Sequence, residues 1–593
     1  MNWRAILFAL AVLLLSPLAA EAANFTQGAG PATKFGTHEI VLRGNGGVAN
    51  PFDTNATVTF TPPSGAGNAK TVKAFYDGGN TWRARVYVSE AGTWTWSSAS
   101  AIDAGLNGNS GSFVANPSTL KGIVRRHPSN PKAFVTDDGQ WFPMIMEWGS
   151  LLFTQDKTDW QAFIHDAAVM GVNMIIANAS GDKGQASPPG PSDPTAVDPW
   201  LGVGSVDYTR YDLTQFQTVD TREIYTLNNY PNMYYEWVML ANSTFGDGGT
   251  YWLSLASTIR HNTLDYMIAR WAAFPNLMWL NMLGDTDYTQ ATAQAFARDV
   301  GSYVVAHDPW HHSFSVRGIR DQAFQFLGAG DTTWVGRVSL MTSYPEGAGE
   351  IHPYDSSAYH VSNADQYQEG YGGPFANARY FFRWSFWSWL LAGGSSNHGS
   401  FYAVDPPYLT SGYTGLDSVP YLWKYFQDRN IDLGLFQPQP GLMADNRPGA
   451  IQENISESME LLRRGGTEFI VYHPNYGVGM ETPGATPDPN VAAGFTLNLT
   501  SYPGAFTAEW YRPHDGVAQS AGTISGGVVR NFTAPWVGYD AVLRLVLTSS
   551  TNPPNAPANL TISSIQSSRI AGDSAATFWA FQTQFRSGHS LAR

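Results

Sequence analysis

The chain has 593 residues with a hydrophobic content of 43% and a charged content of 14%, which excludes an intrinsically disordered protein and predicts two to four domains. Its net charge of −14 argues against a nucleic-acid partner, because binding to phosphate backbones favours the opposite sign. The absence of cysteine excludes thiolate catalysis, cysteine-ligated zinc and iron–sulfur clusters, while the aromatic content of 14% suits either sugar binding or β-rich cores.

The first 23 residues have the pattern of an export signal. Arg4 precedes an apolar run, Ala5 to Leu15, which is too short to span a bilayer comfortably. The sequence Ala20-Glu21-Ala22 is a typical A-x-A cleavage site. We therefore expect residues 1–23 to be removed near Ala22–Ala23, and the mature chain to be secreted or periplasmic without a membrane span.

Two segments have a pure β pattern with turn signals and no helical period. Residues 24–120 contain short alternating runs such as Trp82 to Val88, and residues 451–549 contain runs such as Phe506 to Tyr511. Each segment predicts an antiparallel β-sandwich. Residues 550–593 begin with a proline-rich linker and have little periodicity, so we expect a partly disordered tail.

The segment between the two sandwiches, residues 121–450, alternates apolar strand patterns with helix patterns. Eight strand candidates in about 300 residues are the repeat of a (β/α)8 TIM barrel, and no glycine-rich phosphate loop supports a doubly wound sheet. A long insert at about 181–228 is expected to shape the substrate subsites. The strand candidates are Trp141–Met146, Val172–Ala177, Met233–Leu240, Leu277–Met282, Ser313–Val316, Val338–Thr342, Tyr359–Ala364 and Ser400–Val404.

Functional residues of a barrel lie at the carboxyl ends of its strands. Reading those positions gives a rim dominated by acidic and aromatic side chains. Two segments are the most informative: NLMWLNMLGD, which ends an apolar strand at Asp285, and NADQYQEGYGG, which carries Asp365 and Glu369. The further candidates, as sugar contacts, are Glu147, Trp148, Asn178, His312, Tyr344 and His398.

Carboxylates after the fourth and seventh strands face each other across a barrel mouth. Asp285 follows the fourth strand candidate, and Asp365 and Glu369 follow the seventh. Hydrolysis of an acetal needs two opposed carboxyl groups, one to protonate the leaving oxygen and one to attack or stabilise the anomeric carbon. The pattern therefore indicates a glycosidase, and it leaves open whether Asp365 or Glu369 is the second group.

Motifs of competing chemistries are missing from the sequence. There is no H-E-x-x-H, G-x-S-x-G or Walker-type loop. His311 and His312 are adjacent, so their side chains point apart on a strand and chelate a metal poorly. We therefore predict no metal site and no cofactor.

The sequence resembles the apiosidase-like glycoside hydrolases of the large retaining (β/α)8 clan. The likeness rests on FVTDDGQWFPMIMEWGSLLF, NLMWLNMLGD and RYFFRWSFWSWLLAGGSSNHGSFYAV in the barrel, on AFYDGGNTWRARVYVSEAGTWTW before it, and on EFIVYHPNYG, AEWYRPHDG and DAVLRLV after it. The last three motifs are similar to a β-sandwich related to collagen-binding modules.

This resemblance implies a general acid/base at Asp285 and a nucleophile at the end of the seventh strand. The family usually has Glu there, followed four residues later by Glu-Gly, so the gap-free match puts Asp365 at the nucleophile and Glu369 at the second acid. The first strand ends with Glu147 where the family more often has Gly-Asp.

Two functions follow from the sequence. The first is a secreted, monomeric, retaining glycoside hydrolase that acts on a plant or microbial polysaccharide. The alternative is a non-catalytic carbohydrate-binding or adhesion protein on a barrel scaffold, which the aspartate at the seventh strand keeps open. The enzyme needs two opposed acids, whereas the binding protein needs only aromatic side chains.

Overall fold

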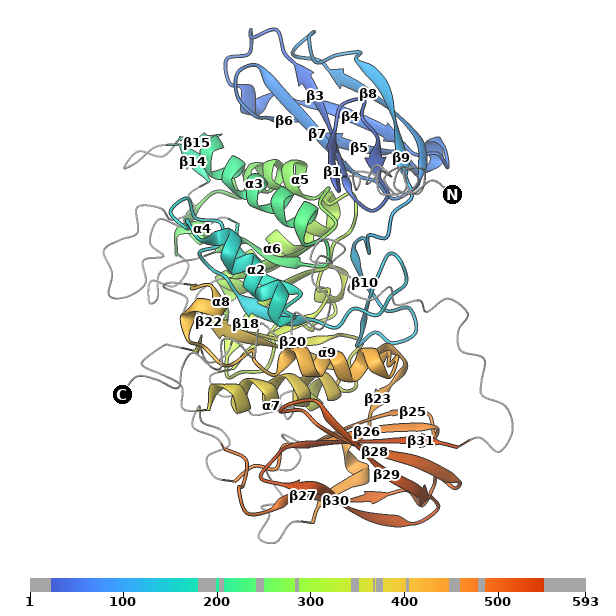
Figure 1. Cartoon of the computed structure of the whole chain (residues 1–593). Coiled ribbons are helices and arrows are strands. Elements are labelled where there is room, and N and C mark those ends of the chain that lie inside the picture. Colours follow the sequence, from blue (N-terminus) through green and yellow to red (C-terminus); the bar gives the residue numbers. More distant parts are fainter. Residues whose placement is uncertain are drawn as a thin grey trace, which may run out of the picture.

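The structure is a computed structural model that describes residues 23–179, 199–201, 207–241, 250–282, 287–342, 351–365, 368–369, 377–400, 405–446, 459–477 and 486–548. Figure 1 shows a central barrel between two β-sandwiches, as the sequence predicts. The predicted signal, the predicted tail, Asp285 and Tyr344 lie outside the described residues.

The N-terminal sandwich consists of a four-stranded and a five-stranded sheet. The four-stranded sheet has the order β1 (Phe25–Gln27), β3 (Thr37–Arg43), β7 (Thr81–Tyr87) and β6 (Phe75–Tyr76). The five-stranded sheet has the order β2 (Ala32–Thr33), β9 (Ser110–Asn116), β8 (Gly92–Ser100), β4 (Ala56–Thr61) and β5 (Lys70–Lys73). Two short 3-10 turns, η1 (Pro51–Asp53) and η2 (Ala66–Asn68), lie between strands.

Eight parallel strands of the described chain close into a barrel, because the first strand pairs with both the second and the eighth. In order these are β12 (Ile145–Trp148), β13 (Met174–Asn178), β16 (Tyr234–Ala241), β17 (Leu277–Met282), β18 (Phe314–Arg320), β19 (Val338–Met341), β20 (Val361–Asp365) and β22 (Gly394–Ser400). The two-residue strand β21 (Gln368–Glu369) follows β20 and pairs with the end of β22.

Helices cover the outside of the barrel (Figure 1). They are α2 (Trp160–Met170), α3 (Leu213–Asn229), α4 (Thr250–Ser254), α5 (Ser257–Trp271), α6 (Ala291–His307), α7 (Ala378–Leu391), α8 (Tyr408–Ser411) and α9 (Val419–Asp428). The connections also contain the strands β14 (Trp200–Leu201) and β15 (Asp207–Tyr211), and the turns η3 (Asp287–Thr289), η4 (Asp331–Thr333), η6 (His352–Tyr354) and η7 (Leu433–Leu435).

A separate hydrophobic cluster fills the barrel interior. It combines inward-facing strand residues such as Met146, Trp148 and Ile176 with residues that enter from the amino-terminal end, such as Phe134. Phe134 belongs to the antiparallel hairpin of β10 (Val124–Arg126) and β11 (Phe134–Thr136), which closes that end of the barrel. The carboxyl ends of the strands remain as the side on which a substrate site can form.

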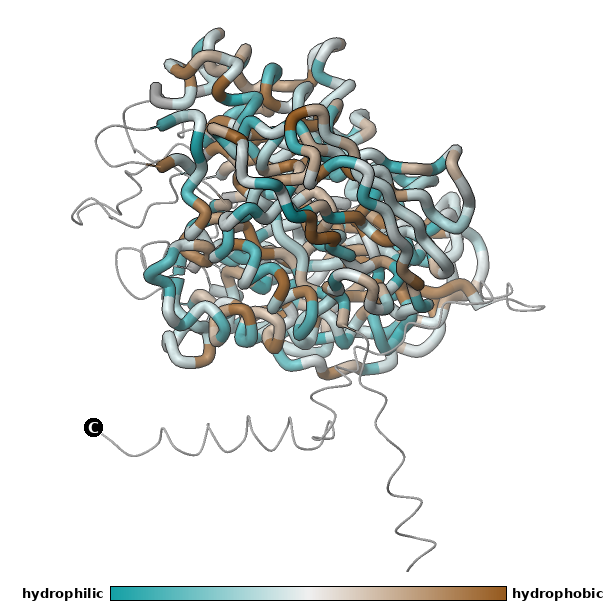
Figure 2. Tube along the Cα trace, turned by 90° about the horizontal axis from the view of Figure 1, so that it is seen from above, coloured by the Kyte–Doolittle hydropathy of each residue, from teal (hydrophilic) through white to brown (hydrophobic). Residues whose placement is uncertain are grey.

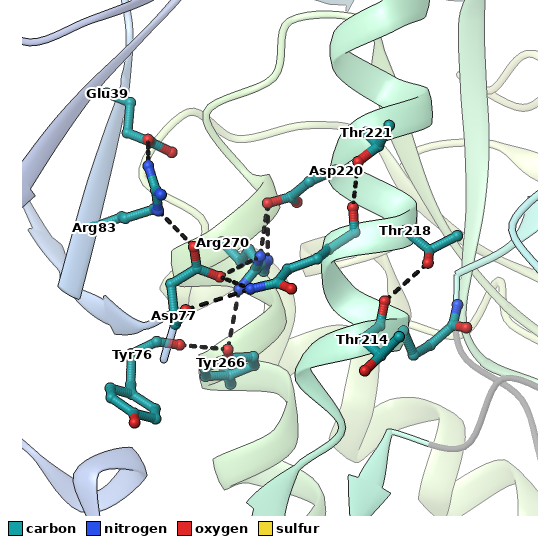
Figure 3. A network of polar contacts seen from close by, with 12 residues as sticks. Glu39, Tyr76, Asp77, Arg83, Thr214, Thr218, Asp220, Thr221, Tyr266 and Arg270 are labelled. Carbon is teal, nitrogen blue, oxygen red and sulfur yellow. Dashed lines mark hydrogen bonds and ion pairs between the residues drawn. The ribbon is translucent and has the colours of Figure 1, made fainter. Parts of the chain in front are cut away.

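A buried ion network joins the N-terminal sandwich to the barrel (Figure 3). Arg270 of α5 binds Asp77 of the sandwich at 2.8 Å and Asp220 of α3 at 2.8 Å. Arg85 of β7 reaches Asp220 at 2.6 Å and Glu39 at 2.8 Å. These ion pairs connect residues of the N-terminal sandwich to residues of α3 and α5, and they hold the sandwich against the two helices.

The C-terminal sandwich packs on α7 and α9 through a six-stranded sheet. That sheet contains β23 (Gln437–Pro438), β25 (Glu460–Arg464), β26 (Glu468–His473), β31 (Ala541–Leu547), β28 (Ala505–Arg512) and β29 (Val517–Ser525). The second sheet contains β24 (Met443–Asp445), β27 (Ala492–Asn498) and β30 (Val529–Val537), and the turn η8 (Pro440–Leu442) precedes β24. Arg383 of α7 binds Asp540 of the sandwich at 2.9 Å, and Trp387 stacks on Tyr472.

Figure 2 shows hydrophobic positions as short stretches interrupted by hydrophilic ones. In the part of the chain that the structure describes, no helix combines the length and the apolar character needed to cross a membrane.

Two sequence predictions need correction. The eighth strand, predicted over Ser400–Val404, already begins at Gly394 and runs through Gly394–Ser400 in the described residues, so His398 lies within the strand and not before it; residues 401–404 lie outside the described residues. The segment at 181–228, predicted as an insert, contains the second barrel helix, α3. Four threonines weaken its helix propensity, and Asp212 compensates by capping the first turn through the N–H groups of Thr214 and Gln215.

Candidate active site

The first two barrel strands each direct one polar or aromatic candidate into the barrel near its carboxyl end. Trp148 ends β12 and belongs to the interior cluster. Asn178 ends β13 and lies on the same face as the interior residue Ile176, because side chains alternate along a strand. Both side chains are buried, with exposed fractions of 4% and 2%.

The end of the seventh strand departs from regular pairing. Asp365 is the last residue of β20, and the register with β19 shifts between Leu340 and Met341, so that Met341 lies opposite Asp365. Such a bulge re-aims the side chains that follow it, and bulges often lie beside active sites. The side chain of Asp365 is not among the described atoms. Asp285 follows β17 by three residues and lies outside the described residues.

Glu147, His398 and Glu369 form a hydrogen-bonded cluster, here called the His398 cluster. The two ring nitrogens of His398 contact Glu147 Oε1 at 3.2 Å and Glu369 Oε2 at 2.9 Å. Glu147 and His398 are register partners on β12 and β22. All three side chains are buried.

The His398 cluster lies outside the barrel wall. Glu147 stands between Met146 and Trp148, which face the interior, so its own side chain faces the surrounding helices. His398 contacts Phe382 of α7 edge-on, which places it on the same outer side. This position does not fit the sugar contacts that the sequence predicts for Glu147 and His398.

The cluster holds one cation between two carboxylates. Burial opposes the charged imidazole, but the hydrogen bonds and charges of Glu147 and Glu369 raise the pKa of His398 to about 9. Burial raises the pKa of Glu147, against the lowering effect of His398. Glu147 Oε2 has no hydrogen-bond partner among the described residues. At neutral pH the imidazolium therefore neutralises part of the buried negative charge.

Both carboxylate oxygens of Glu369 are occupied. Oε1 accepts the backbone N–H of Thr414 at 2.8 Å, and Oε2 accepts that of Gly415 at 3.0 Å in addition to the His398 contact. Its backbone pairs with Ser400 of β22. Glu369 thus ties the segment after the seventh strand to the eighth strand and to the loop after α8.

His312 occupies the opposite end of the barrel. It precedes β18, and its ring nitrogens contact Asp308 Oδ2 at 2.8 Å and the backbone carbonyl of Phe274 at 3.1 Å. The pKa of Asp308 is lowered to about 2, because His312 and neighbouring donors outweigh the effect of burial. This buried pair supports the amino-terminal ends of β17 and β18, which does not fit the predicted sugar contact.

Sequence reasoning missed Arg317. It lies on β18 between Val316, which packs in the outer core, and Gly318, so its side chain faces the interior together with that of Ser315. Only 7% of Arg317 is exposed. The available signal was an arginine within the strand FSVRGIR, because a buried charge in a strand requires a specific reason.

Among the residues that the structure describes, no group of three or more histidine, aspartate or glutamate side chains is arranged to hold a metal ion.

Comparisons with known proteins agree with the architecture. A putative glycoside hydrolase from Bacteroides vulgatus ATCC 8482 is 16% identical with a TM-score of 0.66, covering 88% of this chain and 100% of its own. A structure described as a glycoside hydrolase has a TM-score of 0.54 at 14% identity, covering 73% and 98%. A family 5 glycoside hydrolase from the same Bacteroides strain has a TM-score of 0.53 at 13% identity, covering 72% and 93%.

Sequence comparisons match a smaller part of the chain than the structural comparisons do. Residues 31–101, within the N-terminal sandwich, match a domain of unknown function, DUF5060. No curated protein matches the chain. At these low identities the structural neighbours establish a shared fold, a TIM-like barrel with additional β-sheet domains at both ends.

Proposed function

We propose that this protein is an exported glycoside hydrolase that cleaves glycosidic bonds in a plant or microbial polysaccharide with retention of configuration. In this proposal Asp285 is the general acid/base and Asp365 is the nucleophile. Support comes from the barrel fold, from the likeness to glycoside hydrolases and from the acids that follow the fourth and seventh strands. The finer assignment to the apiosidase-like group rests on the sequence motifs.

The observation that carries the choice of nucleophile is the environment of Glu369. Its two oxygens accept two backbone N–H groups and contact His398, outside the barrel wall. A nucleophile needs a free oxygen within reach of the anomeric carbon. Asp365, at the bulged end of β20, is the remaining acid of this segment.

In the proposed reaction Asp285 donates a proton to the leaving oxygen while a carboxylate oxygen of Asp365 bonds to the anomeric carbon. Asp285 then removes a proton from a water molecule, which displaces Asp365 and releases the sugar with its original configuration. A retaining pair requires carboxyl groups about 5–5.5 Å apart. The His398 cluster would hold β21 and thereby the rim segment that carries Asp365.

Substrate contacts are proposed for the side chains that face the barrel interior. Trp148 offers a ring for stacking on a sugar, and Asn178 offers a hydrogen-bonding amide. Arg317 adds a cation that suits a hydroxyl-rich or carboxylated sugar. Tyr344 remains a candidate from the sequence.

The test begins with a panel of aryl furanosides, aryl pyranosides and polysaccharides, followed by proton NMR of the first-formed anomer. On the best aryl substrate, Asp365→Gly should lose most activity and recover it with azide, giving a glycosyl azide of inverted configuration. Asp285→Asn should lose about 10²- to 10⁴-fold on unactivated substrates and less on those with good leaving groups.

Glu369→Gly is the matched control, because it removes an acid four residues away. It should not be rescued by azide. Rescue of Glu369→Gly with no rescue of Asp365→Gly would overturn the assignment of the nucleophile. Sugar binding without hydrolysis of any substrate would favour the carbohydrate-binding protein.

A further inference from the structure

The strands β14 and β15 form a small hairpin on the carboxyl side of the barrel. They belong to the connection between the end of β13 and the start of α3, and connections of this kind lie at the carboxyl ends of the strands. Trp200 of β14 contacts Trp252 of α4 with ring centroids 4.9 Å apart. Since α4 lies in the next such connection, the hairpin borders the side where the proposed active site forms.

The hairpin has little backbone pairing of its own. Trp200 pairs with Tyr211 and Leu201 with Asp207, with a register shift between the two pairs. A two-stranded hairpin of this size is not stable without support from other elements. Its position must therefore be set by what it packs against.

The N-terminal sandwich contributes to that support through η1, beside the barrel helices whose Tyr266 stacks on Tyr211 at 4.3 Å. The Asn50 side chain donates a hydrogen bond from Nδ2 to the carbonyl of Thr209 on β15, at 3.0 Å. The Phe52 ring meets Tyr211, the last residue of β15, edge-on at 5.3 Å. Phe52 also contacts Tyr266 of α5 at 5.7 Å.

A chain of aromatic contacts connects this point to the sandwich core. Phe52 packs edge-on against Tyr76 at 5.1 Å, and Tyr76 contacts the buried Trp82 at 5.0 Å. Trp82 is 1% exposed and cannot shift without disturbing the sandwich. The position of the hairpin therefore depends on contacts with a rigid domain outside the barrel.

We propose that the N-terminal sandwich is a functional part of the substrate site, in which Asn50 and Phe52 position the β14–β15 hairpin as a remote binding wall for extended oligosaccharides. They are positioning residues, since they act through the hairpin. The kinetic effect that this inference predicts rests on the proposed function as a glycoside hydrolase. The placement of the hairpin is independent of that function.

The test uses two variants of the full chain, Phe52→Ala and Asn50→Asp. Asn50→Asp keeps the oxygen that accepts the Phe52 N–H in η1 but removes the donor to Thr209, together with the Nδ2 bond to Asp53 Oδ2 within η1. Hydrogen exchange measured by mass spectrometry should show at least tenfold faster exchange for peptides covering 207–212, with the β17 peptides unchanged. Val114→Ala is the control, because Val114 is 51% exposed on the other sheet of the same sandwich.

The kinetic readout separates long from short substrates. Both variants should raise KM for an oligosaccharide about tenfold and leave kcat for a short aryl glycoside within twofold of the parent, unlike the control. Unchanged exchange at 207–212 in both variants would overturn the proposal. So would a normal KM for oligosaccharides despite faster exchange.

If the parent protein hydrolyses nothing, the proposed function fails while the exchange experiment still decides whether the sandwich positions the hairpin. A thermal unfolding scan confirms that each variant is folded. Should Phe52→Ala be unfolded, Asn50→Asp carries the test alone.

Discussion

Asp365 and Glu369 are both acids of one segment, yet their environments differ. Asp365 ends a barrel strand at a bulge, whereas Glu369 is buried between β22 and the loop after α8. A carboxylate that accepts several N–H groups is a structural anchor, because its lone pairs are already used. The hydrogen bonds of Glu369 place its side chain outside the barrel wall.

Gly415 is the residue that permits the tight contact around Glu369. A Cβ at this position would lie 2.5 Å from Phe382 Cδ2, 2.7 Å from Glu369 Oε2 and 2.8 Å from His398 Cδ2. Gly415→Ala should therefore lower the free energy of unfolding by about 1–3 kcal/mol, as overpacking does. The measurement is chemical denaturation.

Gly441→Ala provides the comparison, since beyond its neighbours along the chain no atom lies within 4 Å of the Cβ it would add. Equal stability of the two alanine variants would contradict the packing described for the His398 cluster.

The barrel and the carboxyl ends of its strands could be predicted from the sequence, whereas the face of the barrel on which each candidate residue lies could not. The ends of apolar strands predict Asp285, Trp148 and Asn178, and the roles of these three residues stay predictions. The position at a strand end also predicts Glu147 and His398 as site residues. Successive side chains of a strand point to opposite faces, however, so a residue next to an interior position faces the outside of the barrel. His312 is predicted as a site residue because it is close to a strand. It precedes β18, however, and therefore lies at the amino-terminal end of the barrel.

At the scale of elements, apolar patterns succeed where a strand packs against hydrophobic neighbours. Leu277–Met282 was predicted with the bounds that the structure has. The bounds of strand β22, Gly394–Ser400, could not be predicted from hydropathy because its buried side chains are polar. Ser396 bonds Ser385 of α7 at 2.6 Å, and Asn397 donates to the carbonyl of Asn363 at 3.0 Å. Such a strand depends on long-range partners that local hydropathy cannot indicate.

The contact between the N-terminal sandwich and helices α3 and α5 depends on Asp220. Its carboxylate binds both Arg85 and Arg270, and the charges of these arginines overcome burial and lower the pKa of Asp220 to about 2. Asp220→Asn should cost about 3–5 kcal/mol of unfolding free energy, because it leaves two buried cations short of a counter-charge.

Asp299→Asn on α6 is the matched control. Its partners Arg260 and His261 contact it from α5, but 32% of the Asp299 side chain is exposed. Solvent-exposed ion pairs contribute little. Thermal unfolding should separate the two variants, and a small loss for Asp220→Asn would mean that the network adds no net stability.

For the whole molecule, buried titratable groups predict a stability that falls on the alkaline side. Despite the opposing effect of burial, carboxylate partners raise the pKa of His352 to about 10 and that of His398 to about 9. Each folded-state value lies above the ordinary value of 6.5, so the stabilisation is complete below pH 6.5 and is lost as the pH rises through the folded values.

Carboxyl groups buried in the protein add to the same trend. Burial raises the pKa of Glu460 to about 7 and that of Glu223 well above its ordinary value. The folded state then holds protons that the unfolded state releases. Below pH 6.5 the trend is opposed, since burial lowers the pKa of His38 and His360 to about 4 and these groups favour folding as the pH rises.

The expected result is a free energy of unfolding that decreases between pH 6.5 and 10 as the two imidazoles lose their protons. Urea denaturation at several pH values measures it. His352→Gln should flatten the decline, because it removes one of the two raised imidazoles, whereas His307→Gln at the exposed end of α6 should not. A curve that is flat above pH 6.5 would contradict these assignments.

The contact that closes the barrel, between His398 and Glu147, joins residues 251 positions apart. A ribosome that adds about 5–20 residues each second needs roughly 13 to 50 s to make that length of chain. Throughout this interval β12 lacks one of its two neighbours, and the apolar strands β13, β16 and β17 belong to a sheet that cannot yet close. The first half of the barrel therefore waits, with its edges unpaired, for a partner that has not been synthesised.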